Sequence, residues 1–270
     1  MRSAAYLGLL AVLAAALPTL AVGQQGPAAA AGSGAATLAP SFTIWDVKLG
    51  QPVSTIPDAD IVNVSCGTNG GPPALALKTF LDFAKCTPEA SGLREVHFEY
   101  DDEQAYVAKA LELEYRFLQA GTSVYAHPVN LSVLVDDKGI ARGIRIITDN
   151  RASIRDRRSA AGLEQNLRAR FNTWPLNCTK LPPIDGEESL GATFVHDVCT
   201  ATDAQSGERL RIEARYMRRK GQVGIDPDTQ KLLRDNFDSS TRFELVQAPY
   251  QPAEPPQQAL PPDAAPASNG

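Results

Sequence analysis

Four cysteines, arranged as two pairs of similar spacing, constrain the fold of this chain more than any other feature. They are Cys66, Cys86, Cys178 and Cys199. An even number of cysteines in an exported chain predicts disulfide bonds, and four cysteines allow three pairings. We favour Cys66–Cys86 and Cys178–Cys199, because each of these pairs encloses one compact local unit. Neither gap has the short Cys-x-x-Cys spacing of zinc-binding modules, so a metal site is the weaker interpretation.

The N-terminus indicates that the chain is exported. Arg2 supplies a positive charge, residues 4–17 form an apolar segment, and the small residues Ala21 and Gly23 stand where a signal peptidase cleaves. This pattern predicts a signal peptide over residues 1–23. The apolar segment is too short to span a bilayer comfortably, and we expect no integral membrane span after cleavage. The predicted location is therefore the periplasm or the extracellular space.

Composition separates a folded part from two flanking segments. Residues 24–41 are rich in Ala, Gly, Gln and Ser, which predicts a flexible linker. Residues 248–270 are rich in Pro and Ala, and they predict a disordered tail because they cannot bury enough apolar surface to offset chain entropy. The folded part is then residues 42–247. Its length of about 200 residues suffices for one core, or for two small lobes at 42–150 and 151–247.

The residue patterns of the folded part predict an α+β domain, in which two to three helices pack on an antiparallel sheet stapled by the disulfides. Apolar residues recur at helical spacing in three segments, which are 72–86, 101–121 and 153–171. Alternating or β-rich segments predict strands at 93–100, in a hairpin over 129–147, and at 192–199, 209–217 and 241–247.

The segment "SCGTNGGPP", residues 65–73, either holds a ligand or turns a corner beside a disulfide. Its glycines lack the spacing of a phosphate-binding loop, and its two prolines remove amide donors that an anion would need. We therefore interpret the segment as a corner, in which Asn69, Gly70 and Gly71 adopt positive φ angles.

Few residues have the arrangement that catalysis requires. The motifs His-Glu-x-x-His and Gly-x-Ser-x-Gly do not occur in the sequence. A carboxylate-dependent hydrolase would need Glu95, Glu99, Asp101 and His97 to converge in a cleft. We interpret Glu95, His97 and Glu99 instead as the exposed polar face of a strand, because strand residues two apart diverge from any one ligand. An enzyme is thus the less favoured interpretation, and we predict neither a cofactor nor a metal.

The charge distribution points to an anionic partner that is not a nucleic acid. The chain has 26 Lys and Arg against 31 Asp and Glu, and its net charge of −5 lacks the basic footprint of nucleic-acid binding. Arginines nevertheless gather in two segments, and the candidate binding residues are Arg151, Arg155, Arg157, Arg158, Arg209, Arg211 and Arg215. They form either a solvated face that pairs with acidic residues 95–114, or a surface that binds carboxylates or phosphates.

These patterns together predict an exported binding or envelope-associated protein that uses an arginine-rich surface. The expected partner is an envelope protein or an anionic cell-wall polymer. The alternative is a secreted hydrolase that depends on carboxylates.

Overall fold

The computed structural model describes residues 42–100, 122–152, 157–220, 224–225, 231–233 and 237–254. The predicted signal peptide, the predicted linker and the predicted helix at 101–121 lie outside these residues, as does the C-terminal tail beyond residue 254.

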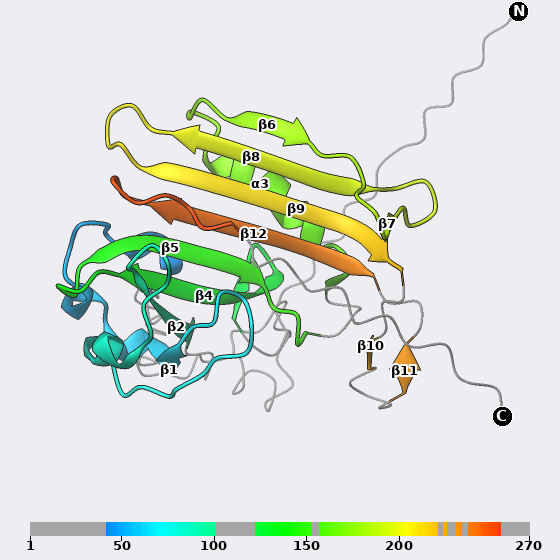
Figure 1. Ribbon diagram of the computed structural model, residues 1–270. Helices are drawn as coiled ribbons and strands as arrows, with labels where there is room; N and C mark the ends of the chain where they lie inside the picture. Colours follow the sequence, from blue (N-terminus) through cyan, green and yellow to red (C-terminus); the bar gives the residue numbers. More distant parts are fainter. Residues whose placement is uncertain are drawn as a thin grey trace, which may run out of the picture. The chain divides into compact units, whose positions relative to one another are not determined.

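Antiparallel strands in the described ranges form one ten-stranded sheet, whose main path is β1-β2-β4-β5-β12-β9-β8-β6 (Figure 1). Their bounds are β1 Ile61–Cys66, β2 Arg94–Tyr100, β4 His127–Val135, β5 Ala141–Thr148, β12 Asp238–Val246, β9 Arg209–Arg219, β8 Val195–Thr202 and β6 Asn177–Lys180. The short strands β3 (Ser123–Val124) and β7 (Glu187–Glu188) pair with β4 and β9. A separate pair consists of β10 (Gly224–Ile225) and β11 (Leu232–Leu233). Because β12 lies between β5 and β9, the sheet is continuous from β1 to β6.

The predicted α+β fold with two to three packed helices is wrong, because the architecture is dominated by this large antiparallel sheet. The one α-helix that lies wholly within the described residues is α3 (Leu163–Arg170), which follows the 3-10 turn η5 (Ala160–Gly162). The predicted helix at 72–86 is instead an extended segment followed by the 3-10 helix η4 (Phe80–Lys85).

The extended part of that segment turns back along β1. The Ala74 amide donates to the Cys66 carbonyl at 2.9 Å, and the Leu77 amide donates to the Val64 carbonyl at 2.8 Å. Helical conformation starts only after Thr79, whose hydroxyl accepts a hydrogen bond from the Leu81 amide. The helical spacing of the apolar residues gave a wrong prediction. Hydrogen bonding of this segment to β1 overrides its weak local preference for a helix.

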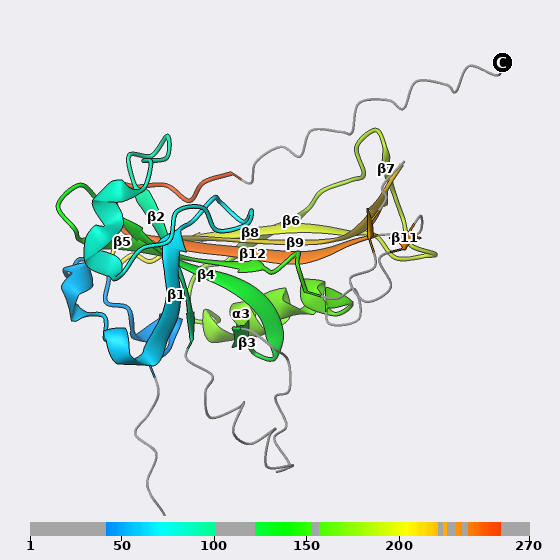
Figure 2. The same ribbon diagram turned by 90° about the horizontal axis from the view of Figure 1, so that it is seen from below.

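One face of the sheet is apolar and packs into the hydrophobic core. Register neighbours Phe98, Leu131, Ile146, Phe243 and Ile212 form one continuous row across five strands, and all are buried. This face is covered by α3, η5 and two N-terminal 3-10 turns, which are η1 (Ile44–Asp46) and η2 (Val53–Thr55). A third turn, η3 (Asp58–Asp60), precedes β1 and contributes no buried residue. Figure 2 shows α3 and the N-terminal segment on this side of the strands.

The second face of the sheet is polar, yet much of it is also buried. The neighbouring row runs through His97, Ser132, Arg145, Glu244 and Arg211, and its first four members are buried. The predicted alternation in β2 is confirmed, but its interpretation as an exposed polar face is wrong. Loop 67–73, segment 86–93 and segment 247–254 make contacts with this face.

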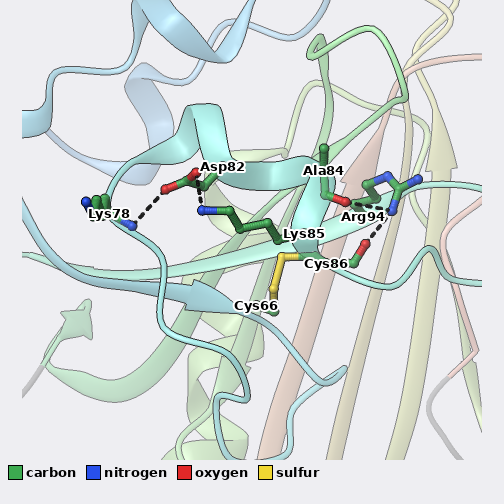
Figure 3. The surroundings of a disulfide bond; sticks show 7 residues. All are labelled: Cys66, Lys78, Asp82, Ala84, Lys85, Cys86 and Arg94. Atoms are coloured by element: carbon green, nitrogen blue, oxygen red, sulfur yellow. Dashed lines mark hydrogen bonds and ion pairs between the residues drawn. A yellow bond between two sulfur atoms is a disulfide. The ribbon is translucent and has the colours of Figure 1, made fainter.

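Both predicted disulfides are confirmed, since Cys66 bonds to Cys86 and Cys178 bonds to Cys199. The first joins the end of β1 to the residue after η4 (Figure 3). Beside it, the Arg94 guanidinium donates to the carbonyl of Cys86. The second bond joins register partners on β6 and β8, so it ties the edge strand to its neighbour.

The C-terminal segment that follows β12 is held against the polar face. Arg209 Nη1 donates to the Tyr250 carbonyl at 3.0 Å, and the Tyr250 side chain packs on buried Leu93, Leu134 and Val246. Replacing Tyr250 with alanine is therefore expected to lower the free energy of unfolding by about 2 kcal/mol, because partly buried aromatic surface becomes exposed. Urea unfolding of Y250A and wild type measures this difference. Equal midpoints would show that the segment only rests on the surface.

Candidate functional site

The buried charge network on the polar face is centred on Arg145, whose side chain is 1% exposed. Its guanidinium contacts Glu89 at 2.6 Å, Glu244 at 2.8 Å and Glu95 at 2.9 Å. Burial alone lowers the pKa of Arg145, but the Glu89 hydrogen bond and the charges of Glu95 and Glu244 together raise it above its usual range. The cation is therefore permanent, and it contacts three carboxylates from separate segments of the chain.

Arg242 connects this network to the loop at 67–73. Its Nη2 donates to Glu244 Oε2 at 2.9 Å and to Asn69 Oδ1 at 2.5 Å, while the Asn69 amide donates to Glu95 Oε2 at 2.6 Å. Burial, together with the nearby charge of Arg145, lowers the pKa of Arg242. Its buried Nε has no hydrogen-bond partner within the described parts of the chain.

Glu213 is the centre of a second set of contacts on β9 and β8. Its carboxylate accepts from Arg215 Nε at 2.8 Å and from Arg211 Nη2 at 3.0 Å, and it lies 3.1 Å from His196 Nε2. Burial raises the pKa of Glu213, but the His196 hydrogen bond and the two arginines outweigh it and lower the value to about 2. Glu213 is therefore an anion across the physiological pH range.

A cavity of about 330 Å³ opens on this side of the sheet, where loop 68–71 meets β12 and β9. Most of its lining residues are polar or charged. The full lining is Thr68, Asn69, Gly70, Gly71, Ile147, Thr148, Asn150, Arg157, Glu213, Arg215, Asp238, Ser239, Ser240, Thr241 and Arg242. The hydroxyls of Ser239 and Thr241 are hydrogen-bonded to backbone groups of residues 158–161. A concave site with convergent polar groups is the usual form of a small-ligand site.

The charges around the cavity leave one cation in excess. Arg215 is paired with Glu213 and Asp238 with Arg219, whose Nε lies 2.9 Å from the Asp238 carboxylate. Arg157 forms no salt bridge with any other described residue, and its Nε donates only to the Ala152 carbonyl at 2.9 Å. Burial lowers the pKa of Arg157, while the charges of Asp238 and Asp149 act in the opposite direction. A half-buried guanidinium with unused donors therefore lines the cavity.

Three of the arginines selected from the sequence meet at this site. Arg157 and Arg215 line the cavity, and Arg211 lies beside it on Glu213. The Arg158 side chain is exposed and does not line the cavity. Its backbone carbonyl accepts a hydrogen bond from the Ser239 hydroxyl at 3.2 Å.

The remaining selected arginines lie elsewhere. Arg209 holds the C-terminal segment through carbonyl oxygens. Arg151 pairs with Asp149 at 2.9 Å and is about half exposed. Arg155 lies outside the described residues.

Sequence reasoning missed Arg145 and Arg242 as site residues. The available signal was the alternation in β12, where Arg242 and Glu244 alternate with Thr241, Phe243 and Leu245. Charged residues that alternate with apolar residues along one strand indicate that the sheet has a second, polar face. Nothing in the local sequence shows that this polar face is buried.

The segment "SCGTNGGPP" turns a corner and also lines the cavity. Asn69 and Gly70 have positive φ angles of 58° and 95°, as predicted, whereas Gly71 does not. Gly67 is required for a different reason, because a Cβ atom there would lie 2.3 Å from Glu95 Cγ. The loop therefore depends on its glycines both for its turn and for its close approach to the charge network.

The residues proposed for a hydrolase do not share this cavity. Glu95 is held by Arg145 and by the Asn69 amide, and His97 Nε2 lies 3.7 Å from Glu99 Oε1. Asp101 lies outside the described residues. Within the parts of the chain that are described, no cluster of three or more His, Cys, Asp or Glu side chains is arranged to hold a metal ion.

No protein-family model, curated protein or solved structure matches this chain. Over the described residues, no helix is long and apolar enough to cross a membrane.

Proposed function

We propose that this chain is an exported binding protein that holds an anionic group of an envelope component in the cavity beside loop 68–71. The observation that carries the proposal is Arg157, a half-buried cation that lines the cavity and has no carboxylate partner among the described residues. A carboxylate or phosphate would provide the charge-assisted hydrogen bonds that Arg157 lacks.

Arg242 and the hydroxyl groups strengthen the preference for an anion. Arg242 adds a second guanidinium to the lining of the cavity. Thr68 and Ser240 offer hydroxyls that can orient a ligand without adding charge. The carboxylates of Glu213 and Asp238 are already paired with arginines, so they repel an entering anion less than free carboxylates would.

Export explains which anions the protein meets. Two disulfides are typical of an oxidising compartment, which supports the proposed periplasmic or secreted location. There the proposed partner is an anionic cell-wall polymer, or an envelope protein that presents an acidic group. A cavity of about 330 Å³ suits a single sugar-sized end group better than an extended surface.

Replacing Arg157 with glutamine is expected to weaken capture of envelope glycan fragments about tenfold, because one buried charge-assisted contact is lost. The matched control is Arg158→Gln, which removes the neighbouring exposed arginine outside the cavity lining. Binding is measured by titrating fragments against each purified variant. Equal affinities for R157Q and R158Q would contradict the proposal.

A further inference from the structure

A second cavity, also of about 330 Å³, lies on the opposite, apolar face of the sheet. Its floor includes Ile144 of β5 and Leu245 of β12, which are adjacent in register and belong to the hydrophobic core. Its other walls come from the segment around η1 and from the end of α3, and they are Trp45, Val47, Leu49 and Phe171. Ile144 is 3% exposed and Leu245 8% exposed, so only the edges of these two core side chains line the cavity.

The aromatic residues of this cavity are fixed by their neighbours. The Trp45 ring packs edge-on against Phe243 at 5.8 Å and against Phe171 at 6.3 Å, measured between ring centroids. Because Phe243 is part of the buried core, the Trp45 wall is positioned before any ligand arrives.

Two cations and one carboxyl complete the lining. Arg170 stacks on Trp45, with its Cζ 4.1 Å from the ring centroid, and Lys48 is exposed beside it. An arginine stacked in this way keeps its in-plane N–H donors available. Hydrogen bonds from Thr43 lower the pKa of Asp46, and the charges of Lys48 and Arg170 lower it further. Burial raises the pKa of Glu208, the carboxyl that lines the cavity.

We propose that this cavity binds an amphiphilic anion, whose apolar chain contacts Ile144 and Leu245 and whose carboxylate meets Arg170 and Lys48. A medium-chain fatty acid is the simplest ligand of this class. The apolar walls favour the chain through burial of its surface, and the cations favour a charged head over a neutral one. The inference does not depend on the proposed function, because it uses other residues on the other face of the sheet.

Tryptophan fluorescence tests this inference, because the chain contains only two tryptophans, Trp45 and Trp174. In a Trp174→Phe variant of the full chain, the emission of Trp45 reports directly on the cavity. Decanoate is expected to change this emission saturably. In the series from hexanoate to decanoate, affinity is expected to rise about fourfold per methylene until the cavity is full. Acetate should have no effect.

The charge requirement is tested by Arg170→Gln and Lys48→Gln in the same background. Each change is expected to weaken decanoate binding about tenfold and to leave decanol binding unchanged, because only the head-group contact is lost. Arg168→Gln is the matched control, since Arg168 lies on the same helix but outside this cavity. Lys48→Gln keeps the test valid should R170Q fail to fold.

Three results would each overturn the inference. They are a Trp45 emission that decanoate leaves unchanged, equal affinity for decanoate and decanol in the parent protein, and R168Q losses as large as those of folded R170Q or K48Q.

Discussion

Replacing Arg145 with leucine is expected to lower the free energy of unfolding by about 4 kcal/mol, the largest effect of any single change described. The substitution leaves the carboxylates of Glu89, Glu95 and Glu244 in a buried site without their central cation. Removing one partner of a buried ion pair strands an uncompensated charge, which costs more than the pair itself contributes. Urea unfolding at pH 7 measures the loss.

A matched control and a second substitution separate this effect from general loss of charge. Arg151→Leu removes an arginine that is about half exposed and pairs with Asp149, so we expect a change of less than about 1 kcal/mol. Adding Glu95→Gln to Arg145→Leu should recover part of the stability, because Glu95 is a buried carboxylate whose salt bridge among the described residues is to Arg145. If R145L loses no more stability than R151L, the buried network does not stabilise the fold.

Replacing Glu213 with glutamine is expected to cost about 3 kcal/mol at pH 7 and to have little effect near pH 2. The pKa of Glu213 is lowered to about 2 in the folded protein, which is below the value of an unfolded glutamate. Its contribution is therefore fully present above the unfolded pKa. It is lost as the pH falls from about 5 towards the folded pKa of about 2.

Urea unfolding of E213Q and wild type at pH 7, 4 and 2.5 tests this dependence. The difference between the two proteins should shrink steadily as the pH falls. Asp137→Asn is the control, since Asp137 is an exposed carboxylate that pairs with an arginine at the surface, and this variant should behave like wild type. A difference for E213Q that is the same at all three pH values would show that its charge is not what stabilises the fold.

The sequence predicts the elements of this fold where local pattern decides the structure. The hairpin of β4 and β5 and the alternation in β9 follow from apolar residues at every second position. Both disulfides follow from spacing, because each pair closes a short local loop.

Local pattern fails where distant segments decide the structure. Residues 72–86 have helical spacing, yet Ala74 and Leu77 hydrogen-bond to β1. The polar residues of β2 look solvent-facing, yet segment 86–93 and loop 67–73 bury them. Asn69 donates to Glu95 of β2, and Glu89 contacts Arg145 of β5 on the same face. No periodicity in β2 itself predicts these contacts.

The candidate site could be predicted only in part, because some of its residues come together through contacts between distant segments. Arg157 and Arg215 stand out as members of arginine-rich segments, and both line the cavity. Arg242 is isolated in the sequence, and its contact with Asn69 joins residues 173 positions apart. Such a pairing depends on β12 lying between β5 and β9, which composition and spacing do not specify.

Chemical-shift mapping by NMR tests the proposed anion site most directly. Adding glucuronate or inorganic phosphate to the labelled protein is expected to perturb the amides of Asn69, Gly70, Ser239 and Ser240, which line the cavity around Arg157. The same perturbations should require about tenfold more anion in R157Q and should be retained in R158Q. Unchanged spectra with both anions, or shifts that R157Q and R158Q reduce equally, would contradict the account.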